Sequence, residues 1–287
     1  MISRSYFTKS LLLAFCFSLI FPVIAQAISK QQMGLVINLA GKQRMLTQKM
    51  SKEAFFIAKG INIEANKASL TKTAALFDKT LNGLMNGDAD LNLPKTEDPA
   101  IIAQLLTVSK LWNQFAPSIQ AVASGNANAE VLNKIAAQNI PLLKNMNKAV
   151  QMYAKSSGSN LDAGMATTIN LAGKQRMLTQ KMTKELLMLA NNVDAANSKK
   201  SMAGTTALFE KTLNGLINGD ASLGLPGTQD GAIVQQLNVV KKIWGEYKPV
   251  LASADISDTG LAQAEKLNIP LLKEMNKAVK MYEKSIK

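Results

Sequence analysis

The stretch Ile37–Met50 reads INLAGKQRMLTQKM, and the same fourteen residues return without a single change at Ile169–Met182. The sequence on either side of the two copies has diverged further. A segment that only had to be helical and amphipathic could exchange Leu for Met or Lys for Arg at little cost in stability. The identity therefore indicates that individual side chains of this segment matter, unless a recent local duplication left the two copies alike.

The repeat extends well beyond this segment. Leu76–Leu84 corresponds to Leu208–Leu216, and Asn139–Lys144 corresponds to Asn268–Lys273. Two copies of about 130 residues each are the size of domains, whereas a solenoid needs shorter and more numerous units. We therefore predict one domain at residues 28–157 and a second at 158–287.

The N-terminus has the order of parts that a secretory signal peptide shows. Arg4 and Lys9 form a basic start, Leu11–Leu19 is apolar, and Ala25-Gln26-Ala27 offers a cleavage site. We predict a cleaved signal peptide at residues 1–27 and a periplasmic product, with an uncleaved N-terminal anchor as the alternative. The chain's single cysteine, Cys16, lies inside this segment, so the exported product would have neither disulfides nor thiol chemistry.

The apolar pattern of each copy is helical throughout. In the first copy we predict helices over Lys30–Gly60, Ala65–Met85 and Ala100–Ala123, and a fourth that ends near Lys155. Pro141 lies inside this fourth helix and should kink or split it, because proline removes a backbone hydrogen bond. The short segment Ser156–Asn160 would join the copies. The predicted fold class is all-α, with two tandem four-helix up-down bundles.

The composition disfavours several classes of function. The formal net charge is +13, or +11 once Arg4 and Lys9 are removed, which is compatible with an anionic ligand, lipid or partner. Nucleic acid is disfavoured by export and by an aromatic content of only 5%. Histidine is absent, and we find no paired nucleophile and base, no paired carboxylates repeated in both copies and no phosphate-binding glycine loop. Asp88-x-Asp90-x-Asn92 resembles the start of a calcium loop but lacks its glycine and its terminal glutamate. We therefore expect no enzymatic activity, no cofactor and no metal.

A helical wheel divides the repeated segment into two faces. Leu39, Leu46 and Met50 form an apolar stripe that should pack inside the bundle. The opposite stripe contains Gly41 and Arg44, together with Ile37, Gln48 and, at its margin, Ala40. It combines small residues, which let a second helix approach, with an arginine that would then need an anion or an acceptor.

These opposite stripes suggest a physical hypothesis. If the two copies face each other, across the interdomain segment or across a homodimer, Arg44 and Arg176 converge. Two guanidinium groups repel each other unless an anion lies between them, and an oxyanion fits their planar forks. The alternative is that the two arginines pair with carboxylates such as Glu53 and Glu185 or simply reach solvent.

The repeated segment resembles the N-terminal sensory domain of PilJ-type chemotaxis transducers, which reads N-x-A-G-[RK]-Q-R-M-L-[ST]-Q-[RK]-M. It is more distantly similar to the A-G-x-x-R-M segment of nitrate-sensing histidine kinases, here Ala40-Gly41 with Arg44-Met45, and Ala172-Gly173 with Arg176-Met177. The resemblance implies a four-helix sensory bundle that holds a small anion such as nitrate. With the wheel, it gives these candidate ligand-binding residues: Gly41, Arg44, Met45, Gln48, Gly173, Arg176, Met177 and Gln180.

The families that the segment resembles continue into a membrane helix and a signalling domain, whereas this chain ends at Lys287. We therefore expect an exported binding protein that presents its anion to a membrane receptor or chemotaxis partner. Its two copies would form either an intramolecular pseudo-dimer or part of a homodimer. The alternative function is a structural or adaptor protein of the cell envelope that uses the same helix faces for protein contacts and binds no small molecule.

Overall fold

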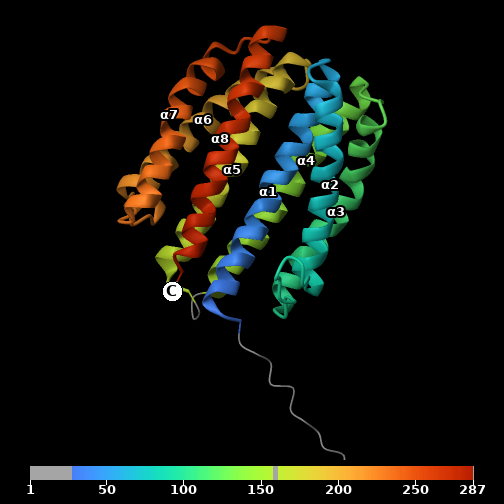
Figure 1. Cartoon of the computed structure of the whole chain (residues 1–287). Coiled ribbons are helices and arrows are strands. Elements are labelled where there is room, and N and C mark those ends of the chain that lie inside the picture. The colour runs from blue at the N-terminus through green and yellow to red at the C-terminus, as the bar shows by residue number, and fades with distance from the viewer. Residues whose placement is uncertain (1–27, 158–160, 287) are drawn as a thin grey trace, which may run out of the picture.

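The computed structural model describes residues 28–157 and 161–286, which form two consecutive sets of four long helices (Figure 1). The first set is α1 (Lys30–Ala58), α2 (Ile63–Asn86), α3 (Pro99–Ala123) and α4 (Ala129–Ser156). The second is α5 (Ala163–Ala190), α6 (Ala195–Asn218), α7 (Gly231–Ser253) and α8 (Asp258–Lys284), with a short 3-10 turn η2 (Ala221–Leu223) before α7. The predicted fold class, tandem all-α four-helix bundles, is confirmed.

Some of the predictions concern residues outside the described ranges. The signal peptide at 1–27 and residues Gly158–Asn160 of the joining segment are among these, so the domain boundaries stay predictions. Within the described ranges, no helix combines the length and apolar character that crossing a bilayer requires.

The helices begin where side chains can cap their free N–H groups. Ser29 and Gln32 form a capping box at the start of α1, and Asp98 caps α3 immediately before Pro99. The prediction that Pro141 could split the fourth helix is wrong, because α4 runs unbroken through it, as α8 does through Pro270. Buried neighbours such as Leu142 hold the helix together across the lost hydrogen bond.

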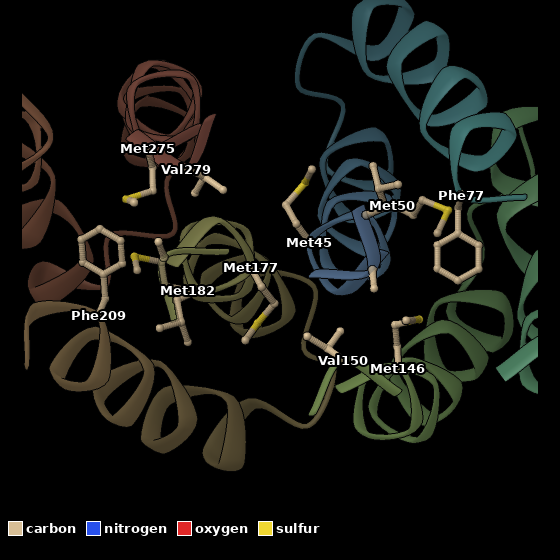
Figure 2. Close-up of a cluster of buried hydrophobic side chains, with 14 of the residues drawn as sticks. Met45, Met50, Phe77, Met146, Val150, Met177, Met182, Phe209, Met275 and Val279 are labelled. Carbon is tan, nitrogen blue, oxygen red and sulfur yellow. The ribbon is translucent and has the colours of Figure 1, made fainter. Parts of the chain in front are cut away.

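Helices α1 and α5 lie side by side at the centre of the molecule, with α2 and α3 on one side and α6 and α7 on the other (Figure 1). They run parallel: near one end Ile169 approaches Gly34, and near the other the Asn191 side chain donates to the Phe55 carbonyl at 3.3 Å. The hydrophobic core continues from one copy into the other, with Met45 and Met177 between the two central helices (Figure 2).

This central position explains where the helical wheel failed. From Val36 to Ile57 every residue of α1 is buried except three half-buried ones: Leu39, Lys42 and Lys49. Leu46 and Met50 are buried as predicted, but Leu39 of the same stripe is only half-buried. Ile37, on the stripe predicted to face outward, is completely buried. The helix has α2 and α4 on one side and α5 on the other, so it has almost no free face.

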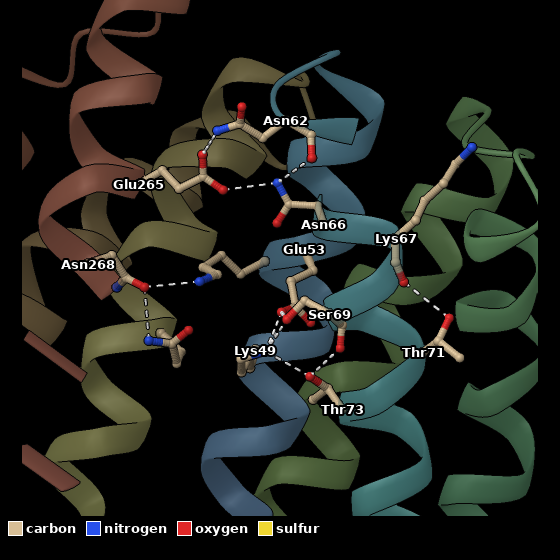
Figure 3. Close-up of polar contacts among 12 residues, drawn as sticks. Lys49, Glu53, Asn62, Asn66, Lys67, Ser69, Thr71, Thr73, Glu265 and Asn268 are labelled. Atoms are coloured by element: carbon tan, nitrogen blue, oxygen red, sulfur yellow. Dashed lines mark hydrogen bonds and ion pairs between the residues drawn. The ribbon is translucent and has the colours of Figure 1, made fainter. Parts of the chain in front are cut away.

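Polar contacts also join the two copies. The buried carboxylate of Glu265 on α8 accepts hydrogen bonds from Asn62 at 2.5 Å and Asn66 at 2.9 Å, both at the start of α2 (Figure 3). Asn62 has a left-handed backbone and makes no capping bond of its own, so its amide is free to reach across. The second copy has Asp194 at the position of Asn62, so the contact between Asn62 and Glu265 has no symmetric equivalent.

Because one core spans both copies, we predict that they unfold together. Each copy carries one tryptophan in its core, Trp112 or Trp244. The variants Trp112→Phe and Trp244→Phe each keep one tryptophan, so the fluorescence of each variant reports on a single copy. In urea, the fluorescence midpoint of each variant should equal the midpoint measured for the same variant by circular dichroism, which reports on both copies. Two separated transitions in either variant would show that the copies are independent.

Candidate functional site

The candidate site is formed by Arg44 on α1 and Arg176 on α5, which meet at the centre of the helix pair. Each side chain is only 1% exposed. A Cβ atom placed on Gly41 would lie 3.3 Å from Nη2 of Arg44 and 3.9 Å from Nη2 of Arg176. A Cβ on Gly173 would lie 3.4 Å from Nη2 of Arg176 and 3.6 Å from Nη2 of Arg44. Both guanidinium groups therefore point at one spot, and the two glycines leave the room for them.

The same set of contacts holds each arginine. Nη1 of Arg44 donates to Oδ1 of Asn147 on α4 at 2.7 Å, and Nη2 donates to the Asn170 carbonyl on α5 at 2.9 Å. Arg176 repeats this arrangement with the corresponding residues of the other copy. These are Asn276 on α8 at 2.8 Å and the carbonyl of Asn38 on α1 at 3.1 Å. The copies are thus related by a pseudo-two-fold axis that passes between the arginines.

Sequence reasoning missed the two asparagines on α4 and α8. The signal was present, because Asn147 and Asn276 occupy equivalent places in the repeats KNMNKAV and KEMNKAV. Two residues earlier the copies differ, with Asn145 in one and Glu274 in the other, whereas the asparagine at 147 and 276 is the same in both. An identical polar residue directly after a core methionine, Met146 or Met275, is the signal that could have identified these partners of the arginines.

The arginines have no carboxylate partner close enough for an ion pair. Within the described ranges, none of the ion pairs includes Arg44 or Arg176, and the Nε–H group of each meets no hydrogen-bond acceptor. Glu53 is instead bound to Lys49 and to the Ser69 hydroxyl, and Glu185 has the same arrangement. The alternative that the arginines pair with Glu53 and Glu185, or reach solvent, is wrong.

The surroundings of the pair are strongly positive. Burial, and then the charge of Arg176, lowers the pKa of Arg44 to about 9, and burial lowers that of Arg176 to about 10. Both groups remain charged at neutral pH. Two half-buried lysines lie near them: the pKa of Lys42 is lowered by burial and by Arg176, and that of Lys174 by burial and by Arg44. An anion would meet a concentrated positive potential here.

The other candidate residues lie near the arginines but have different neighbours. Met45 and Met177 are apolar packing between α1 and α5 (Figure 2). Gln48 donates to Oδ1 of Asn139 on α4 at 2.8 Å, and Gln180 donates to Asn268 on α8 at 3.0 Å. Both glutamines are completely buried, with Oε1 unpaired.

A second polar cluster, which we call the lysine–asparagine cluster (Gln48, Lys52, Asn139, Gln180, Lys184 and Asn268), crosses between the copies. Lys52 on α1 donates to Asn268 at 3.0 Å (Figure 3), and Lys184 on α5 donates to Asn139 at 3.1 Å. Burial lowers the pKa of each lysine to about 8. Neither lysine is among the residues predicted for the site.

Two parallel central helices that meet at paired arginines, each within its own four-helix set, place the chain among the tandem helical bundles. The chain belongs to the PilJ family: the family model, described as the type IV pili methyl-accepting chemotaxis transducer N-terminus, matches residues 28–137 and 161–268. The predicted resemblance is confirmed. Membership of this family supports a signalling or sensory role.

Similar proteins are chemotaxis transducers. The methyl-accepting chemotaxis protein McpN of Pseudomonas aeruginosa is 34% identical over 116 residues, which cover 40% of this chain and 21% of McpN. The protein PilJ of the same organism is 24% identical over 213 residues, 72% of this chain and 30% of PilJ. The putative methyl-accepting chemotaxis AlkN of Alcanivorax borkumensis is 23% identical over 215 residues, 74% of this chain and 29% of AlkN. The chain spans less than a third of each.

The lysine–asparagine cluster predicts a pH dependence of stability. The folded-state pKa of Lys52 and Lys184, about 8, lies below the ordinary 10.5, so the unfolded state binds more protons between these values. The free energy of unfolding should therefore rise as the pH goes from 8 to 10. The variant Lys52→Met/Lys184→Met should be more stable at pH 7, by roughly 1–3 kcal/mol per lysine, and should show a smaller rise.

Urea titrations at several pH values measure both effects. The matched control is Lys110→Met/Lys242→Met, which removes two exposed lysines at equivalent positions of the two copies. It should keep the wild-type slope. Equal slopes for all three proteins would contradict the prediction.

Proposed function

We propose that this chain is a periplasmic sensory binding protein that recognises a small anion such as nitrate between Arg44 and Arg176. The observation that carries the proposal is the convergence of two buried guanidinium groups without a carboxylate in ion-pair contact. Folding brings like charges together only at a cost, and an anion between them removes the repulsion. The apolar packing of α1 on α5 holds the pair in place while the position is empty.

The geometry favours a small oxyanion. Each guanidinium group still has its Nε–H unpaired, and planar forks of N–H donors match the oxygens of a planar anion. Cβ atoms placed on Gly41 and Gly173 would already lie 3.3–3.9 Å from the two Nη2 atoms, so a bulky ligand has no room between these helices. Since both arginines are 1% exposed, an anion must enter when α1 and α5 separate briefly. Binding is thereby tied to the geometry of the helix pair.

The signalling context is proposed from the relatives. They are chemotaxis transducers, and the family model covers the N-terminal part of such proteins. We propose that the bound state of this chain is read by a membrane receptor or chemotaxis partner. The predicted signal peptide supports export to the periplasm.

The adaptor alternative receives less support from the structure. It needs the faces that carry Gly41, Arg44 and Gln48 to be available to another protein, and all three residues are buried inside the chain. The pseudo-dimer within one chain already covers these faces.

Nitrate at millimolar concentration should raise the melting temperature by several degrees, because a ligand that binds only the folded state stabilises it. Arg44→Ala should abolish the rise. Gly41→Ala is a sharper variant: its methyl group would stand 3.3 Å from Nη2 of Arg44, in the place proposed for the anion, while alanine itself favours the helix. It should fold and lose the nitrate response.

Differential scanning fluorimetry measures these shifts, with chloride at equal ionic strength as the salt reference. Lys79→Ala, which removes an exposed charge that pairs with Asp88 and Asp90, is the control and should respond like wild type. No shift of the wild type with nitrate, nitrite or other small oxyanions would remove the support for the proposal.

A further inference from the structure

The arginine pair is nearly symmetric, but its surroundings differ on the two sides. Glu283 in the last turn of α8 corresponds in the repeat to Ala154 on α4. Only the second copy therefore places a carboxylate at this position. Lys280, one turn earlier, likewise corresponds to Gln151. The Arg176 side of the pair thus has an acidic group that the Arg44 side lacks.

Glu283 is connected to Arg176 through one side chain. The Asn38 amide donates from Nδ2 to Oε2 of Glu283, while its Oδ1 accepts from Nη2 of Arg176 at 2.7 Å. The charge of Glu283 raises the pKa of Arg176, against the effect of burial. In the other copy, Oδ1 of Asn170, the counterpart of Asn38, is buried and has no hydrogen-bond partner. The Asn38 amide is therefore oriented by the carboxylate, and that of Asn170 is not.

The consequence is a different number of acceptors on the two arginines. Nη2 of Arg176 already donates to two oxygens of Asn38, its carbonyl and its side chain. Nη2 of Arg44 donates to the Asn170 carbonyl alone. A ligand between the guanidinium groups would find more free N–H groups on Arg44. On the other side it would have to displace the Asn38 amide from Arg176.

We infer that Glu283 is an affinity-setting residue of the site: through Asn38 it competes with the ligand for Arg176 and makes the site asymmetric. This inference rests on the proposed anion site. The carboxylate compensates part of the positive charge when no anion is bound, which stabilises the empty state. It also opposes an arriving anion by direct repulsion, because like charges in a partly buried setting are poorly screened. Binding should therefore be weaker than two buried arginines alone would allow.

The repeat supplies a reciprocal pair of variants. Glu283→Gln removes the charge and keeps the shape, so the dissociation constant for nitrate should fall by roughly threefold to tenfold. Ala154→Glu places a carboxylate at the equivalent position of the first copy, where Ala154 is half-buried, and the dissociation constant should rise by a similar factor. Glu246→Gln, which removes an exposed carboxylate on the outer helix α7, should leave it unchanged.

Isothermal titration calorimetry with sodium nitrate measures the constants, and melting temperatures in nitrate-free buffer give a second readout. The inference predicts that Glu283→Gln melts lower than wild type without nitrate and gains more from it. An unchanged dissociation constant in Glu283→Gln, with a wild type that binds, overturns the inference and leaves the proposed function standing. Binding by Glu283→Gln alone supports the inference. If neither protein binds nitrate, both proposals fail.

Discussion

The structure depends on the contact between α1 and α5, and that contact contains an energetic conflict. Two guanidinium groups, each 1% exposed, face the same spot, although burying even one charged group without a counter-ion is costly. Four asparagines give partial compensation, by side chain or by backbone carbonyl: Asn38, Asn147, Asn170 and Asn276. The continuous apolar core around the helix pair has to supply the rest.

The pseudo-two-fold axis makes departures from symmetry informative. At the arginines and in the lysine–asparagine cluster, the two copies make equivalent hydrogen bonds and have identical residues. Glu265 and Glu283, both on α8, have alanines as counterparts in α4, and each contacts α1 or α2 of the first copy. The second copy therefore binds the first through two carboxylates on α8, and α4 of the first copy has no carboxylate at the equivalent positions. One consequence is that Nη2 of Arg176 donates to two oxygens of Asn38, whereas Nη2 of Arg44 donates to one carbonyl.

The fold could be predicted from the sequence because helix periodicity and capping are local. The convergence of Arg44 with Arg176 was also predictable, since a repeated arginine beside a repeated glycine demands a partner. The face assignment of Leu39 and Ile37 failed, because a wheel assumes one buried face and α1 is covered nearly all round. The reach of Lys52 to Asn268 could not be foreseen, because it depends on where α8 lies beside α1.

The central position of α1 and α5 gives residues of the repeated segment contacts in both copies. Arg44 bonds to α4 of its own bundle and to α5 of the other copy, and Gln48 shares Asn139 with Lys184 of the other copy. A change at Arg44 would therefore disturb contacts within its own bundle and with the other copy. The same double attachment means that a charge placed between the arginines acts on α1, α4, α5 and α8 together. Any change at the arginine pair is therefore coupled to helices of both copies.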